Sequence, residues 1–507
     1  MKIKHQLLAF IIAMLCVAIT PNIYSLSRGS SFFAIRLFPM GSDTLVYENY
    51  LTQVRDGNFL FRDHFTTEPQ NIGILNIFWL TIGLFGRITG AAPEVTFTIS
   101  RLIFFGLLIA ATYIVSGLLW KDEKTRLRAT VFATTITGLG YLLNIFSYGK
   151  IETTDFLKLF SLIGSHAFAT PHISAATILT TSCLLTFYKW TEEHKPNLII
   201  AASIIGAILL EFQPYTFPLL IFIPMTWLFM TRENHSRKHF LHFILYAVML
   251  SIPIAYHIGT VLFDSFTALR YTANITPSAP LIYDLIGFSI ILSLCVIGAL
   301  HKKDAGRLPM FLAVWIAISF IATHLPFRMN IRFIQGTAIV LCLLSFTGFE
   351  YVYNNYLPSL KSKLKQKIIL VALVFGLWGG LAYSIPTMIQ TCFLPITKPL
   401  MLFQDALNSL PPGITISDNY ATLLASARTK HYAYVGHWGE TIDYKNKIRV
   451  FEDIFFQKNT PAASLGKLQS LGIDYVLFDK KFDVLDTSLL SPLYENGSYA
   501  IFGVPKP

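Results

Sequence analysis

The sequence is poor in charged residues, and its few cysteines follow no pattern. Only 14% of its 507 residues are charged, against about a quarter in average soluble proteins, and 53% are hydrophobic. The cysteines contain no Cys-x-x-Cys pair and no spacing typical of a metal site. We therefore expect neither a disulfide framework nor a zinc site, and the composition predicts a polytopic α-helical membrane protein. The five cysteines are Cys16, Cys183, Cys295, Cys342 and Cys392.

Internal repeats and low-complexity linkers are also missing from the sequence. The net charge of +11 does not indicate nucleic-acid binding, because the lysines and arginines form short clusters between apolar runs. Such clusters are typical of the cytoplasmic loops of membrane proteins. The basic clusters therefore indicate which loops face the cytoplasm, and we expect no nucleic-acid partner.

The first apolar run and a shorter segment after it decide the predicted topology. Lys2 and Lys4 precede an apolar run of roughly 20 residues without a convincing cleavage site, which predicts an uncleaved first helix with a cytoplasmic N-terminus. Residues 71–87 offer only about 15 apolar positions, fewer than a span needs. If this segment lies along the outer membrane interface, the basic clusters at 121–128 and 361–367 both fall inside, as the positive-inside rule requires.

On this topology the chain has about eleven spans, and this odd number places the C-terminus outside the cytoplasm.

 The first span covers residues 1–26. Residues 1–390 form the predicted transmembrane domain, with a first outer loop at 27–95. The other expected spans are 96–119, 129–147, 170–190, 197–213, 215–231, 239–260, 281–300, 309–327, 333–353 and 368–389.

From about Thr391 the apolar runs shorten, charges of both signs mix, and Pro411-Pro412-Gly413 marks a turn. We expect a small extracytoplasmic α/β domain at 391–507, without a phosphate loop or a nucleophile elbow. Its predicted strands are 414–417, 431–435, 474–478 and 499–504, and its predicted helices are 421–428 and 463–471.

A polar, carboxylate-rich island at 41–70 stands out between the apolar runs. So many charged groups have to lie outside the hydrocarbon of the membrane or line a water-filled cavity. We therefore expect the catalytic residues to lie in this island. Asp43, Tyr47 and Tyr50 are spaced by four and three, which places them on one face of a short helix that Gly57 ends. A compact polar turn follows and closes at Glu68-Pro69.

The order of residues in this island resembles the first extracytoplasmic loop of the GT-C glycosyltransferases. An Asp is followed by a Tyr four positions later, a Gly-Asn-Phe step, an Arg-Asp pair, and a Glu-Pro that leads into an amphipathic stretch ending at 84–86. The protein O-mannosyltransferases and the lipid A aminoarabinose transferases look most similar. The resemblance implies transfer of a sugar from a polyprenyl-phosphate carrier to a lipid, glycan or protein acceptor, at the outer face of a bacterial inner membrane.

The resemblance also implies roles for two carboxylates. In those families the early loop Asp is the catalytic carboxylate, and the Glu before Pro helps to build the acceptor or metal site. By position these are Asp43 and Glu68. Close relatives often place a Lys between the Glu and the Pro, whereas here Pro69 follows Glu68 directly, so another cation has to bind the phosphate. Asp56 and Asp63 are interpreted as solvated loop charges.

Further candidates follow from chemistry and position. Guanidinium groups stabilise the negative charge of a departing lipid phosphate through paired hydrogen bonds. The candidates at the predicted outer membrane boundary are Arg101, Arg328 and Arg332. Each of them could instead be an anchor at the membrane interface. Tyr47 could stack on a sugar or sit at the interface. His64, with Glu68, could bind a divalent metal ion, or it could simply hydrogen-bond a neighbour in the loop.

Two other classes of function stay open. A flippase or transporter of lipid-linked sugars would carry ionisable groups or broken helices at mid-membrane, whereas the carboxylates here concentrate at one face. A non-catalytic scaffold for envelope assembly is the other alternative, because a fold does not by itself fix an activity.

Overall fold

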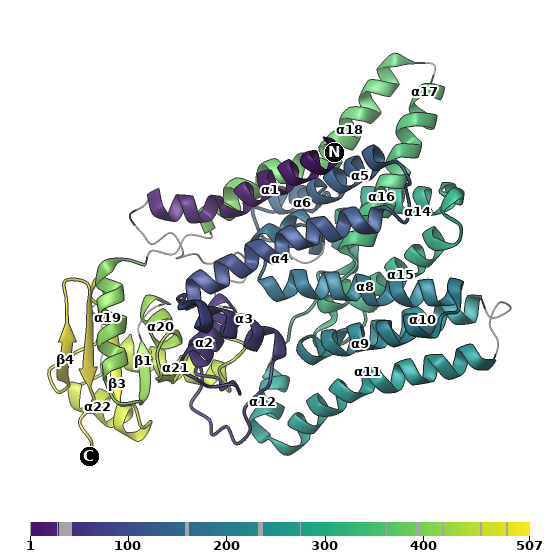
Figure 1. Cartoon of the computed structure of the whole chain (residues 1–507). Helices are drawn as coiled ribbons and strands as arrows, with labels where there is room; N and C mark the ends of the chain where they lie inside the picture. Colours follow the sequence, from purple (N-terminus) through teal and green to yellow (C-terminus); the bar gives the residue numbers. More distant parts are fainter. Residues whose placement is uncertain are drawn as a thin grey trace.

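The computed structural model consists of a bundle of long helices with a small unit containing a β-sheet at one end (Figure 1). Residues 28 and 30–42 of the predicted outer loop, and 392–395 at the predicted domain boundary, lie outside the described residues. The structure describes residues 2–27, 29, 43–157, 162–231, 237–273, 275–360, 362–391, 396–417, 420–456, 459–482 and 485–507.

The helical part runs from α1 to α18, and short 3-10 turns join several of its helices. Its first helices are α1 (Lys2–Ser27), α2 (Asp43–Arg55), α3 (Ile77–Thr89), α4 (Pro93–Ser116), α5 (Glu123–Thr135), α6 (Gly140–Phe146), α7 (Thr154–Leu157), η1 (Gly164–Phe168), α8 (Pro171–Glu193) and α9 (Pro196–Phe212). The others are η2 (Pro214–Thr216), α10 (Phe217–Met230), α11 (Arg237–Phe263), α12 (Ser265–Ala273), α13 (Leu281–Gly287), α14 (Ser289–His301), η4 (Lys303–Ala305), α15 (Leu308–Thr323), η5 (Asn330–Ile334), α16 (Ala338–Tyr351), η6 (Val352–Tyr356), α17 (Leu357–Ser359) and α18 (Lys363–Thr391).

Local sequence explains several of the helix ends. Pro93, Pro171 and Pro196 open α4, α8 and α9, where the fixed φ of proline suits the first turn and its missing N–H costs nothing. The Asn76 side chain caps α3 by accepting a hydrogen bond from the Trp79 N–H. Gly90 ends the same helix with a φ of 68°, a conformation that glycine adopts without strain.

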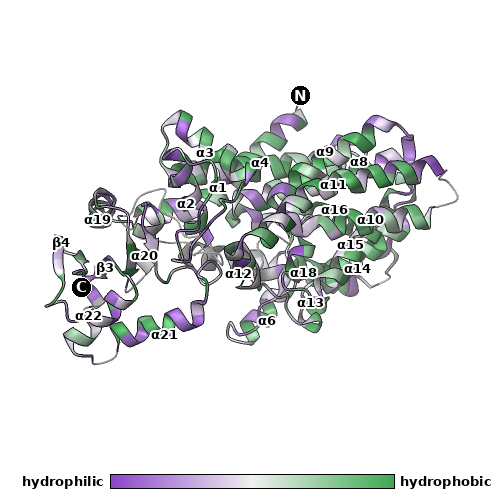
Figure 2. Ribbon diagram, turned by 90° about the horizontal axis from the view of Figure 1, so that it is seen from below, coloured by the Kyte–Doolittle hydropathy of each residue, from purple (hydrophilic) through white to green (hydrophobic). Residues whose placement is uncertain are grey.

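Four helical segments among the described residues are long and apolar enough to cross a membrane, and a fifth is added if the bent pair α13–α14 counts as one span. They are Ile3–Ser27, Pro93–Ser116, Glu123–Phe146 and Arg237–Phe263. Helices overlie the other predicted spans, but α9, α10, α15 and α16 have only 14 to 17 residues. A span needs roughly 20 residues, so the predicted count of about eleven is not confirmed. Figure 2 shows hydrophobic residues along the helices of the bundle.

Helices α2 and α3 lie between the bundle and the C-terminal unit (Figure 1), and α2, α3 and α4 pack against one another. Gly83 makes this packing possible, because a Cβ there would meet the Cβ of Val54 at 2.7 Å. A Cβ at Gly86 would likewise meet Oγ1 of Thr96, on α4, at 2.5 Å. The two glycines therefore let α3 pack closely against both α2 and α4.

The C-terminal unit contains a five-stranded sheet in the order β2-β1-β3-β5-β4. Strands β1 and β3 run parallel, as do β1 and β2, whereas β5 is antiparallel to both β3 and β4. The strands are β1 (Ile414–Ser417), β2 (Tyr432–Ala433), β3 (Tyr475–Asp479), β4 (Ser491–Glu495) and β5 (Tyr499–Gly503). The helices are α19 (Lys398–Ser409), α20 (Tyr420–Ala427), α21 (Tyr444–Phe455) and α22 (Pro461–Ser470), with η7 (Lys480–Phe482) after β3.

All four predicted strands and both predicted helices of this unit are present, but β4, α19 and α21 were not predicted. Strand β4 is an edge strand, mostly exposed and containing Pro492, so it lacks the alternation of buried and exposed residues that marks a strand in sequence. The predicted boundary at residue 390 remains a prediction.

Candidate active site

Within the polar island, one glutamine of helix α2 holds the turn that follows the helix. The Gln53 side chain donates to the Arg62 carbonyl oxygen over 2.7 Å and accepts from the Arg62 N–H over 2.9 Å. Phe61 and Ile74 pair through two backbone hydrogen bonds of 2.9 Å, which close the loop between them. The polar turn at 61–68 is therefore fixed against the helix that begins with Asp43.

Asp43 stands at the N-terminus of α2, where a carboxylate is stabilised by the exposed N–H groups of the first turn. Its Oδ1 lies 2.8 Å from Nε2 of His437, a residue of the C-terminal unit. The Asp43 side chain is 20% exposed and that of His437 is 5% exposed. Asp43 is thus a carboxylate held by one partner and still partly accessible to a ligand.

Tyr47 lies one turn after Asp43 and forms part of an aromatic wall. Its ring stacks on Trp79 with 4.4 Å between the ring centroids, and it tilts against His172 at 4.9 Å. Burial raises the pKa of Tyr47 well above its usual value; Asp43 raises it further and Arg332 lowers it. The phenol therefore stays protonated and can donate a hydrogen bond to a substrate oxygen.

Arg332 belongs to η5 and brings a positive charge into the same neighbourhood. Its guanidinium lies 5.6 Å from the centroid of the Tyr215 ring. Burial alone lowers the pKa of Arg332, but Tyr215, Tyr47 and Asp43 raise it above its usual value. The structure thus brings together three residues that were predicted separately, Asp43, Tyr47 and Arg332.

The other two predicted arginines contact protein carbonyl groups. Arg101 is buried and donates to the carbonyl oxygen of Ala18 over 2.9 Å, to that of Ala167 and to the side chain of Asn22, so it joins α4 to α1 and η1. Arg328 is exposed and donates to the Thr272 carbonyl oxygen over 2.6 Å. Arg332, in contrast, is a charge that acts on Tyr47 and lowers its pKa.

Glu68 and His64, the predicted metal ligands, each have protein partners. Glu68 forms an ion pair of 2.6 Å with Lys447 and accepts a hydrogen bond from Thr66. The Nδ1 of His64 lies 3.0 Å from the Asn49 amide, and burial lowers the pKa of His64 to about 4. In the part of the chain that the structure describes, no three His, Cys, Asp or Glu side chains gather to hold a metal ion. The role of His64 and Glu68 as metal ligands therefore remains a prediction.

Asp63 differs from its interpretation as a solvated charge. It is only 4% exposed, and its Oδ1 accepts from the Phe65 N–H over 2.8 Å. Burial raises the pKa of Asp63 well above its usual value; Glu440 raises it further, and Arg270 lowers it. Asp56, in contrast, is exposed and lies 3.6 Å from Arg55, as expected of a solvated loop residue.

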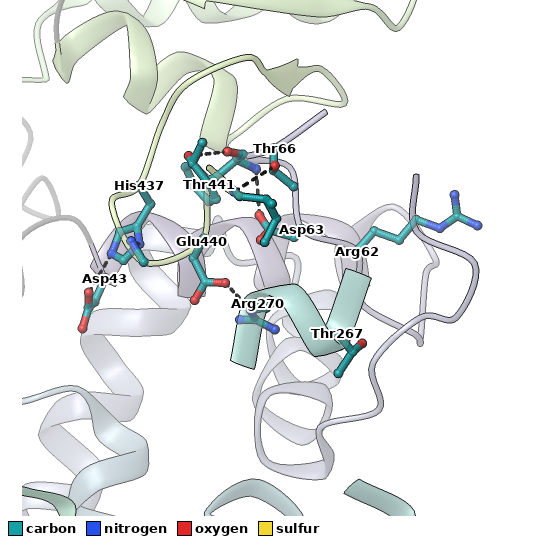
Figure 3. A network of polar contacts seen from close by, with 12 residues as sticks. Asp43, Arg62, Asp63, Thr66, Thr267, Arg270, His437, Glu440 and Thr441 are labelled. Atoms are coloured by element: carbon teal, nitrogen blue, oxygen red, sulfur yellow. Dashed lines mark hydrogen bonds and ion pairs between the residues drawn. The ribbon is translucent and has the colours of Figure 1, made fainter. Parts of the chain in front are cut away.

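Sequence reasoning did not find the loop at 436–442, which reaches from the C-terminal unit to the island (Figure 3). Its His437 contacts Asp43, and its Glu440 forms an ion pair with Arg270 of α12. Arg270 also donates to the Tyr50 hydroxyl over 3.0 Å. The sequence Gly-His-Trp-Gly-Glu at 436–440 could have indicated this loop, because it places a His and a Glu among glycines. The C-terminal region was interpreted as structural instead.

No family model matches the chain, and no curated protein matches it in sequence. Solved structures do match. The oligosaccharyltransferase of Archaeoglobus fulgidus in its apo form is 12% identical, with a TM-score of 0.58 over 94% of this chain and 70% of that one. ArnT from Cupriavidus metallidurans, bound to undecaprenyl phosphate, is 12% identical, with a TM-score of 0.53 over 98% of each chain.

A third match is the mycobacterial arabinofuranosyltransferase AftD, which is 12% identical with a TM-score of 0.52; the match covers 98% of this chain and 42% of AftD. All three proteins are GT-C glycosyltransferases. The chain therefore has the GT-C fold, which confirms the resemblance seen in the polar island. This fold and the long apolar helices indicate an integral membrane protein.

Proposed function

We propose that the protein is a glycosyltransferase that moves a sugar from a polyprenyl-phosphate carrier to an acceptor hydroxyl at the outer face of the membrane. The observation that carries this proposal is that Asp43 and Arg332 both act electrostatically on Tyr47, which lies one turn after Asp43 on helix α2 of a GT-C fold. A base, a hydrogen-bond donor and a cation are the three groups that such a transfer needs.

In the proposed step, the acceptor oxygen forms a bond to the anomeric carbon of the sugar as the bond from that carbon to the phosphate oxygen breaks. The acceptor proton passes to the carboxylate of Asp43, and the polyprenyl phosphate leaves with the electron pair. A positioned carboxylate contributes about two to four orders of magnitude as a general base. The guanidinium of Arg332 stabilises the charge that develops on the departing phosphate.

The ligands of two structural neighbours support a carrier of this kind. ArnT was solved with undecaprenyl phosphate, and the archaeal oligosaccharyltransferase AglB was solved with dolichol phosphate and an inhibitory peptide. In this chain, Glu68 is proposed to orient the acceptor from the polar turn, where Lys447 holds its carboxylate. AglB was also solved with zinc and sulfate. The proposed step is written with side chains alone, because no three His, Cys, Asp or Glu side chains gather to hold a metal ion among the described residues.

The test is sugar transfer by the purified protein in lipid nanodiscs, with a panel of radiolabelled polyprenyl-phosphate sugars. Asp43→Asn keeps the size of the side chain but removes the basic oxygen, so turnover should fall by about two to four orders of magnitude. Donor binding should persist in this variant, since the change leaves Arg332 in place.

Asp56→Asn is the matched control, because Asp56 belongs to the same island but is exposed to solvent. It should keep nearly full turnover. A folded wild-type protein that transfers no sugar from any carrier in the panel would count against the proposed function, and an active Asp43→Asn variant would remove Asp43 from the role of base.

A further inference from the structure

The hydrogen bonds of His437 show which nitrogen of its imidazole carries the proton. The Gly439 N–H donates to Nδ1 of His437 over 3.1 Å, so Nδ1 acts as an acceptor and carries no proton. The proton of the neutral ring is therefore on Nε2, which lies 2.8 Å from Oδ1 of Asp43 and donates to it. In this tautomer the imidazole has no lone pair facing the carboxylate or a substrate beside it.

The backbone around His437 holds the ring in this orientation. The N–H groups of Glu440 and Thr441 donate to the His437 carbonyl oxygen over 3.1 and 2.8 Å. The Thr441 hydroxyl donates to the Phe65 carbonyl oxygen over 2.6 Å, and the Ile442 N–H donates to the hydroxyl of Thr66 over 3.2 Å. The loop at 436–442 is thus fastened to the polar turn that packs on α2 (Figure 3).

We propose, resting on the proposed glycosyltransferase function, that His437 is a positioning residue for the transfer step. Its Nε2–H occupies Oδ1 of Asp43 and leaves Oδ2 as the oxygen that takes the acceptor proton. The proton moves from the acceptor hydroxyl to Oδ2, and the Nε2–H bond of His437 stays intact throughout.

Two substitutions separate this role from a purely structural one. In His437→Asn, the amide oxygen can still accept from the Gly439 N–H, which preserves the turn, but the side chain is too short to reach Asp43. In His437→Gln, the longer side chain places an N–H near the position of Nε2 and restores the donor to Asp43. The matched pair thus keeps either the turn or the contact with the base.

The measurements are kcat and the donor KM, on nanodisc samples with matched thermal stability. His437→Asn should lower kcat about ten- to a hundredfold, the usual effect of losing one hydrogen bond to a charged group, with the donor KM unchanged. His437→Gln should return most of kcat.

The outcomes also distinguish this inference from the function on which it rests. If Asp43→Asn abolishes transfer while His437→Asn keeps the wild-type kcat, the positioning role is wrong and the proposed function stands. If His437→Asn and His437→Gln lose activity equally, His437 only supports the loop, which also overturns the inference. If Asp43→Asn retains normal transfer, both proposals fail.

Discussion

The ion pair between Glu48 and Arg428 should hold helix α2 on the C-terminal unit. Nε of Arg428 lies 2.7 Å from Oε2 of Glu48, and the side chains are 10% and 3% exposed. Removing one partner of a buried pair costs about 3–5 kcal/mol, because the other charge stays buried and unpaired. Since Arg428 keeps some contact with solvent, we expect Arg428→Met to lower the free energy of unfolding by about 3 kcal/mol.

This loss should depend on pH in a defined direction. Burial raises the pKa of Glu48, and Arg428 partly offsets this rise. Removing Arg428 therefore raises the pKa of Glu48 further. A carboxyl with a raised pKa in the folded state is stable when protonated, and that stability is lost as the pH rises through the folded pKa. Arg428→Met should therefore approach the wild-type stability near pH 4.3, the ordinary pKa of Glu, and lose most toward neutral pH.

Denaturant titration in detergent micelles at several pH values measures both effects. Arg55→Met is the matched control, because Arg55 lies on α2 like Glu48 but forms an exposed pair with Asp56. This substitution should lower the free energy of unfolding by less than about 1 kcal/mol. Replacing both Glu48 and Arg428 by Met should recover most of the loss, since no buried charge remains. If Arg428→Met costs no more than Arg55→Met at neutral pH, the reasoning about this pair is refuted.

Two further predictions concern topology and the carrier phosphate. Reporter fusions after residues 124 and 365 should both report cytoplasm, and a fusion at the C-terminus should report the outside; opposite signals would mean that residues 71–87 cross the membrane. Arg332→Gln should weaken binding of polyprenyl phosphate in a direct binding assay, because Arg332 acts on Asp43 and Tyr47, whereas Arg328→Gln should bind almost normally, because Arg328 is exposed and contacts a backbone carbonyl. Equal losses in the two variants would return Arg328 to the site.

Local features of the site could be predicted from the sequence. The spacing of Asp43, Tyr47 and Tyr50 predicted a short helix that Gly57 ends; α2 covers Asp43–Arg55, and Gly57 follows with a φ of 99°. Each of these features depends on neighbouring residues, where periodicity and backbone preference act directly.

Features that depend on distant residues could not be predicted. His437 is 394 positions from Asp43, and no periodicity connects them. Asp63 looked like a solvated charge because the residues that influence it, Glu440 and Arg270, come from the C-terminal unit and from α12. The number of spans was uncertain for a related reason, since short apolar helices can be buried by their neighbours instead of by lipid.

The distance along the chain between Asp43 and His437 also sets an order of events during synthesis. At about 5–20 residues per second, the ribosome takes roughly 20–80 s to make the 394 residues that separate them. The pair of Glu48 and Arg428 is separated by 380 residues and waits almost as long. Helix α2 is therefore made early but receives its partners late, so a nascent chain in the membrane contains Asp43 and Glu48 well before the residues that hold them have been made.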